Sequence, residues 1–83
     1  MKLQCDTGQW INSRHISVYY ISGQNTISCK LIDCEGEHIM LRAVNEPVTQ
    51  DLLDDMMRVI TAKSLNQPLL SQHDLWQELN RLR

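Results

Sequence analysis

The sequence predicts an α+β fold: an antiparallel meander of three or four strands, followed by two helices packed on one face of the sheet. Apolar residues alternate with polar ones before Asn45-Glu46-Pro47 and recur every three to four positions after it. A proline restricts the residue before it, so this segment favours a boundary. The opposite periods place a β half at about 10–44 and a helical half at about 47–83.

The chain length of 83 residues is enough for one small domain, which we expect to span 1–83. A domain of this size buries only about 60–65% of the surface that its unfolded chain exposes, so its core is small. The chain has no Phe, two Trp and two Tyr. Such a core lacks large rigid side chains, and burial against a second copy or a partner would help it.

The first clear strand is predicted over residues 16–21, where alternation gives one apolar face and one mixed face. The apolar face carries Ile16, Val18 and Tyr20, and Tyr19 lies on the mixed face. Gly23-Gln24-Asn25 then favours a hairpin turn.

The second and third strands complete the predicted meander. Residues 26–32 alternate again, with Ile27, Cys29 and Leu31 facing one way and Ser28 and Lys30 the other. Residues 33–36 form a turn, and residues 37–44 form a strand with Ile39, Leu41 and Ala43 inward and His38 and Arg42 outward. A fourth strand around Trp10-Ile11 would lie at an edge.

Two helices are predicted in the second half. The first opens at residues 47–51, carries a broad apolar stripe and ends near Lys63-Ser64. The second begins at Ser71, where Ser71 and Asp74 resemble a capping box and Leu70 and Leu75 are spaced as a hydrophobic staple. Its apolar face is formed by Leu75, Trp76, Leu79 and Leu82.

The candidate ligands for a metal site are Cys29, Cys34 and His38, which form a C-x4-C-x3-H run. Zinc motifs usually begin with a closely spaced ligand pair, and a fourth ligand is not obvious here. Cys29 shares alternate positions with Ile27 and Leu31, which favours a small buried hydrophobe. We therefore expect no metal and no cofactor.

Catalysis is not indicated by any local pattern. No histidine is tied to a nucleophile by sequence, and Gly8, Gly23 and Gly36 are isolated rather than gathered in a phosphate-binding loop. We therefore expect a protein that is not an enzyme.

Charge and cysteine content bear on partners and compartment. The formal net charge is −2 and no basic face emerges, so general affinity for nucleic acid is not indicated. No stretch reaches the length of about 20 apolar residues that a membrane span needs, and the N-terminus turns polar at once. Three cysteines, an odd number, indicate reduced thiols. These observations predict a cytoplasmic protein.

Binding through the sheet is the function that we expect. Tyr19, with Lys30 and Arg42 on the neighbouring strands, would form a polar and aromatic contact patch for another protein or protein complex. The same three side chains also suit stacking on and neutralising RNA, so a small RNA- or DNA-binding domain is the alternative. An ordinary exposed sheet face remains a third interpretation.

A homodimer is also expected, through one of two surfaces. An exposed edge strand is one of them, and the stripe of Leu75, Trp76 and Leu79 is the other. The competing interpretation is that Trp76 closes the core of the monomer over the sheet.

The order of elements resembles that of the smallest type I-F anti-CRISPR proteins. The resemblance is carried by the run from His15 to Tyr19, the hairpin through 26–31, a third strand and two helices, and it covers about residues 12–83. Small bacterial families of unknown function share a similar layout, with Trp10, Gly23, Ile27 and Cys29 as the matching residues.

The anti-CRISPR resemblance implies an inhibitor of phage origin that binds the CRISPR surveillance complex and blocks access to target DNA. In that family the contact residues lie on the sheet. Tyr19 is then the matching contact residue here, with Lys30 and Arg42 as further candidates.

Overall fold

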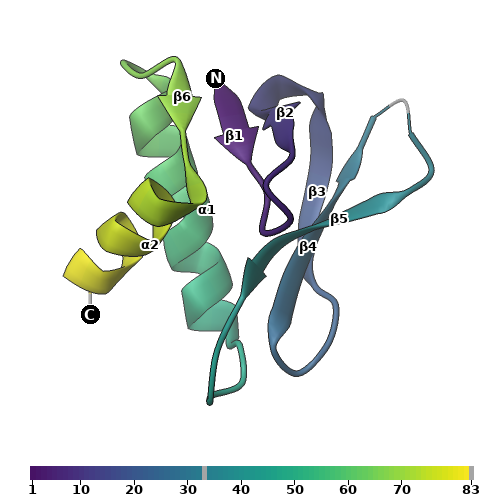
Figure 1. Cartoon of the computed structure of the whole chain (residues 1–83), viewed down its shortest axis with the longest axis vertical. Helices are drawn as coiled ribbons and strands as arrows, with labels where there is room; N and C mark the ends of the chain where they lie inside the picture. Colours follow the sequence, from purple (N-terminus) through teal and green to yellow (C-terminus); the bar gives the residue numbers. More distant parts are fainter. Residues whose placement is uncertain (33, 83) are drawn as a thin grey trace.

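The protein, described by a computed structural model over residues 1–32 and 34–82, has an α+β fold, as predicted. Within these residues six strands form two small sheets, and two helices occupy the C-terminal half. The elements are β1 (Lys2–Gln4), β2 (Trp10–Asn12), a 3-10 turn (Ser13–His15), β3 (Ile16–Ile21), β4 (Thr26–Leu31), β5 (Glu37–Arg42), α1 (Gln50–Ser64), β6 (Leu69–Leu70) and α2 (Gln72–Arg81). In Figure 1 the helices lie on the left, β3 to β5 on the right, and β1 and β2 between them.

The larger sheet, which we call the meander sheet, has the strand order β3-β4-β5 and is antiparallel throughout. It confirms the predicted meander. The predicted turn at 33–36 includes Asp33, which lies outside the described residues. Alternation holds in β4, where Ile27 and Cys29 are buried on the inner face and Lys30 is exposed on the outer face.

A β-bulge in β3 reverses the face that strict alternation predicts for the rest of that strand. Ile16 pairs with Leu31, but the next pair joins Val18 to Lys30, so Ser17 is the extra residue. The Ser17 hydroxyl donates to the carbonyl of Lys30 at 3.1 Å. Beyond the bulge, Val18 therefore shares the outer face with Lys30.

The same bulge turns Tyr19 to the inner face, because Tyr19 pairs with buried Cys29. The prediction that Val18 and Tyr20 lie on the apolar core face was wrong for this reason.

A second bulge lies in β5. Ile27 pairs with Leu41 while Ser28 pairs with Ile39, so Met40 is the extra residue. Met40 and Leu41 are both 0% exposed.

The faces predicted for Ile39 and His38, in the first part of β5, were therefore wrong. Ile39 lies opposite Ser28 on the outer face, and His38 lies opposite Cys29 on the inner face. Arg42 is exposed opposite Thr26, as predicted.

The smaller sheet was not predicted. Its strand order is β2-β1-β6, with β1 and β2 antiparallel and β1 and β6 parallel. The strand expected around Trp10-Ile11 exists as β2, but it pairs with β1 instead of joining the meander. Leu3 lies between Ile11 and Leu70, and all three side chains are buried.

Both helices begin at capping residues. The Thr49 hydroxyl accepts from the backbone N–H of Leu52 at 3.2 Å, and the Ser71 hydroxyl accepts from that of Asp74 at 3.1 Å. The predicted start of α2 is thus confirmed. No helix within 1–32 and 34–82 combines the length and the apolar content that a bilayer crossing requires.

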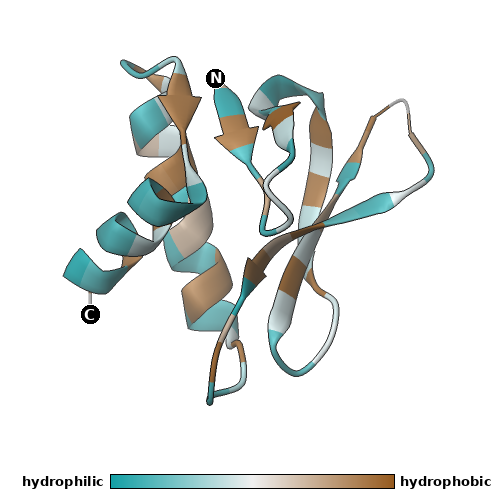
Figure 2. Cartoon of the chain, in the orientation of Figure 1, coloured by the Kyte–Doolittle hydropathy of each residue, from teal (hydrophilic) through white to brown (hydrophobic). Residues whose placement is uncertain are grey.

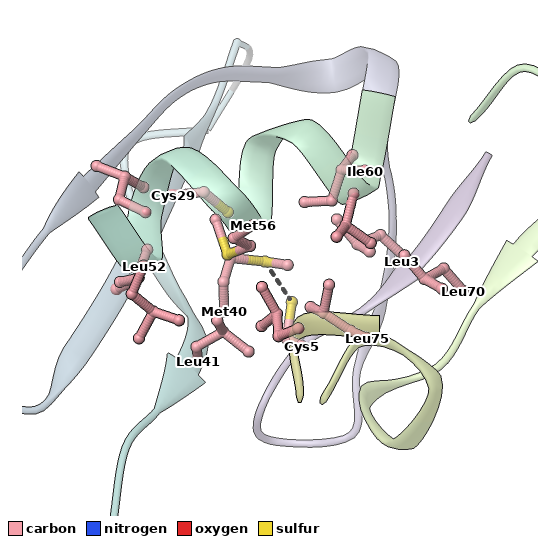
Figure 3. Close-up of a cluster of buried hydrophobic side chains, with 14 of the residues drawn as sticks. Leu3, Cys5, Cys29, Met40, Leu41, Leu52, Met56, Ile60, Leu70 and Leu75 are labelled. Atoms are coloured by element: carbon pink, nitrogen blue, oxygen red, sulfur yellow. Dashed lines mark hydrogen bonds between the residues drawn. The ribbon is translucent and has the colours of Figure 1, made fainter. Parts of the chain in front are cut away.

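The core lies between the meander sheet, the smaller sheet and the two helices. Figure 3 shows its centre, where the Cys5 thiol and the Met40 sulfur lie 3.7 Å apart. The Gln72 side chain donates to the carbonyls of Gln4 and Met40 at 2.8 and 2.6 Å, which ties α2 to β1 and β5. In Figure 2, α2 is mostly hydrophilic, interrupted by the few apolar residues that reach this core.

Candidate protein-binding surface

The outer face of the meander sheet carries a cluster of a half-buried aromatic side chain with exposed aliphatic and charged side chains. The register places Val18, Lys30 and Glu37 in one row across the three strands. Val18 is 45% exposed, and Lys30 and Glu37 are also exposed. Tyr20 lies two residues along β3 from Val18 and therefore on the same face. We call Val18, Tyr20, Lys30 and Glu37 the outer-face cluster.

Polar contacts order the outer-face cluster. The Tyr20 hydroxyl donates a hydrogen bond to the Glu37 carboxylate, reaching from one edge strand of the sheet to the other. The Lys30 ammonium lies 5.8 Å from the centroid of the Tyr20 ring, within the range of a cation–π contact. The hydrogen bond to Glu37 is the largest cause that raises the pKa of Tyr20, to about 12. Tyr20 is therefore a neutral donor at physiological pH, in a fixed position.

A buried polar side chain lies beneath the outer-face cluster, on the central strand β4. Ser28 is 0% exposed and lies between Tyr20 and Ile39 across the strands. Its hydroxyl oxygen is 2.7 Å from that of Ser22, so the buried hydroxyl has a partner. The face thus combines a buried, hydrogen-bonded serine with aromatic and aliphatic side chains.

The structure does not bring together the three side chains predicted to bind a partner. Tyr19 faces inward and packs against the core, and burial raises its pKa. Lys30 and Arg42 are both on the outer face but lie near opposite ends of β4, because Arg42 is opposite Thr26. Arg42 contacts Asp6 at 3.4 Å.

Tyr20, Val18 and Glu37 were missed as candidates for a physical reason. The bulge at Ser17 exchanges the faces of β3, and the bulge at Met40 exchanges those of the first part of β5, so residues that alternation assigns to the core lie outside. The one local sign of the bulge in β3 is Ser17, whose short side chain hydrogen-bonds the Lys30 carbonyl. A serine alone does not predict a bulge, because serine also occurs at ordinary strand positions.

A shallow cleft of about 290 Å³ lies where the end of β5 meets α2. It is lined by Arg42, Ala43, Val44, Glu46, Trp76 and Asn80. Asn45 has a φ of 68°, a left-handed conformation that asparagine tolerates, and it shapes the loop on one side of the cleft. Val44 is 74% exposed beside it. The cleft is at the lower end of the size range for small-ligand sites.

The stripe predicted as a dimer contact lies mostly inside the monomer. Leu75 is 0% exposed and Leu79 is 1% exposed, and both belong to the core of the chain itself. Trp76 is partly buried and packs against the same core. Leu75, Leu79 and part of Trp76 are therefore used by the core of the monomer, and a two-fold contact through this stripe stays a prediction.

The three candidate metal ligands do not form one group in the part of the chain that the structure describes. Cys29 is buried opposite His38, and Cys34 is exposed beyond the end of β4. Burial is the main cause that raises the pKa of the Cys29 thiol to about 12, which disfavours the thiolate that a metal would bind. Among residues 1–32 and 34–82, no three His, Cys, Asp or Glu side chains are grouped as metal ligands.

No protein-family model, curated protein or solved structure matches this chain. The resemblance in layout to type I-F anti-CRISPR proteins is untested by these comparisons and stays a prediction.

Proposed function

We propose that this chain is a non-enzymatic protein-binding module, an inhibitor or regulator that occupies the surface of a cytoplasmic protein with the outer face of its meander sheet. The observation that carries the proposal is the outer-face cluster, in which Tyr20 is held by Glu37 and Lys30 beside an exposed Val18. A tyrosine fixed before binding loses little conformational entropy when a partner covers it.

The charge distribution supports a protein partner over a nucleic acid. Lys30 lies opposite Glu37, and Arg42 contacts Asp6, so each basic side chain of this face has an acidic neighbour. Phosphate backbones are bound by clustered, unpaired cations. The complementary partner is a protein surface with an apolar side chain to cover Val18 and with charges of both signs around it.

Site-specific photo-crosslinking tests the proposal. A photoreactive phenylalanine analogue replaces Val18 in one variant and Leu65 in another, in extract from cells that carry the gene. Leu65 is 84% exposed at the end of α1, so the variant at this position controls for non-specific crosslinking. We expect one dominant protein adduct from position 18 and none of that mass from position 65. Equal adducts from both positions would contradict the proposal.

Titration with random oligonucleotides separates the alternative function. We expect no binding at 50 mM salt and micromolar protein. Binding that weakens steeply between 50 and 200 mM salt would instead identify a nucleic-acid-binding domain, because counterion release gives that dependence. A purified type I-F surveillance complex is the partner that the layout resemblance names, and it can be titrated in the same format.

A further inference from the structure

The two edges of the meander sheet differ in how they are covered. At the β5 edge, the Ile39 carbonyl accepts from the backbone of Asp6 at 2.9 Å and the Met40 carbonyl accepts from Gln72 at 2.6 Å. At the other edge, β3 has β4 as its single strand neighbour within residues 1–32 and 34–82. The β3 edge is therefore the one that a further strand can join.

The hairpin register shows which backbone groups of β3 point to this edge. The backbone N–H of Ser22 donates to the Thr26 carbonyl at 3.1 Å, which makes these two residues a hydrogen-bonded pair. Antiparallel ladders alternate hydrogen-bonded and non-hydrogen-bonded pairs. Tyr20 is then bonded to β4, and the N–H and C=O groups of Tyr19 and Ile21 point away from it.

This edge carries few of the features that protect edge strands from pairing. Residues 16–21 include no charged residue and no proline, and the bulge at Ser17 affects only the first part of the strand. Ile21 is 39% exposed, although its partner across the ladder, Ile27, is 0% exposed. Within residues 1–32 and 34–82, the end of β3 nearest the hairpin turn therefore presents backbone groups that point away from β4 and a partly exposed apolar side chain.

We propose that β3 pairs antiparallel with β3 of a second copy of the chain, around a two-fold axis that passes between the two Tyr20 residues. Tyr19 of each copy then lies opposite Ile21 of the other, and these two pairs exchange about four backbone hydrogen bonds. The register avoids the bulge at Ser17. It also covers Ile21 with an aromatic ring, a favourable cross-strand pair.

A second copy fits this edge because the strand is complementary to itself. The same two residues supply both donors and acceptors, and no charge on the strand repels its copy across the axis. The result is a continuous six-stranded sheet whose outer face carries the outer-face cluster twice. The contact is small, below the range of about 1,200–2,000 Å² of stable interfaces, so we expect weak association that depends on concentration.

Disulfide trapping tests the register. Tyr20→Cys places two cysteines across the axis as a non-hydrogen-bonded pair, about 4.5 Å apart at Cα. Val18→Cys is the matched control on the same strand and face, since position 18 of each copy lies opposite Ser22 of the other. Both variants also carry Cys34→Ser, because Cys34 is exposed and Cys5 and Cys29 are buried.

We expect mild oxidation at 100 µM protein to convert most of the Tyr20→Cys chain to a covalent dimer, at least tenfold faster than the Val18→Cys chain. Equal rates, or faster trapping of Val18→Cys, would overturn the proposed register.

Sedimentation equilibrium tests association without added cysteines. We expect the average mass of the wild-type chain to rise towards that of a dimer between 1 and 500 µM. Ile21→Lys should abolish the rise, and Leu65→Lys, at a site 84% exposed at the end of α1, should leave it unchanged. A monomer mass at every wild-type concentration would overturn self-pairing. The photo-crosslinking experiment at position 18 detects an adduct with a different protein, which differs in mass from a dimer of this chain. Failure of self-pairing can therefore be distinguished from failure of the proposed function.

Discussion

Replacing Met40 with alanine should destabilise the protein much more than replacing its neighbour Ile39. Met40 is 0% exposed, lies 3.7 Å from the Cys5 sulfur and occupies the centre of the core. Truncating a fully buried methionine costs about 2–5 kcal/mol, because apolar contacts are lost and a cavity remains. Ile39 is only partly buried on the outer face, and we expect a cost of about 1 kcal/mol.

These magnitudes are large against the total stability. A domain of 83 residues has a free energy of unfolding of about 4–12 kcal/mol, so Met40→Ala should remove about a sixth of it or more. Urea unfolding followed by circular dichroism measures both variants, and an unchanged m-value shows that the comparison concerns stability alone. An equal or greater loss for Ile39→Ala would refute the bulge, because regular alternation places Ile39 inside and Met40 outside.

Three further predictions concern burial, capping and protonation. Cys34 should react with a thiol reagent at once, and the buried Cys29 only as the chain unfolds, which mass spectrometry of the labelled protein can follow. Burial raises the pKa of Cys29 from 9.0 to about 12, so the folded state keeps a proton that the unfolded state loses. The stability that this protonation contributes is fully present below pH 9. Above pH 9 the free energy of unfolding should fall by up to about 1.4 kcal/mol per pH unit, as urea titrations at several pH values can measure. The fall should be smaller in Cys29→Ala. Ser71→Ala should cost about 1 kcal/mol through the loss of the cap of α2, and a thermal midpoint that does not change would contradict this.

The fold class was predictable from the sequence because the hydrophobic period changes once along the chain. The start of α2 was predictable because Ser71 and Asp74 form a local capping pattern whose geometry does not depend on the rest of the fold. The smaller sheet was not predictable, because β6 has two residues and pairs with β1 from the other end of the chain. Such short strands carry no periodic signal and are determined by tertiary packing.

The candidate surface could be predicted only in part, for a related reason. Alternation correctly placed Lys30 on the outer face of β4, where no bulge intervenes. It failed for Tyr19 and Tyr20, because the extra residue at Ser17 exchanges their faces. A bulge is a property of two paired strands, so the sequence of one strand does not reveal it.

A competition measurement is the sharpest test of the proposal that the outer-face cluster binds a protein partner. The adduct formed from position 18 is quantified in the presence of a tenfold excess of unlabelled competitor. One competitor is the wild-type chain, and the other carries Lys30→Glu with Glu37→Lys, which preserves the net charge and the opposite charges across the strands. We predict that the wild-type chain suppresses the adduct about tenfold and the exchanged variant less than twofold. Equal suppression by the two competitors would contradict the account.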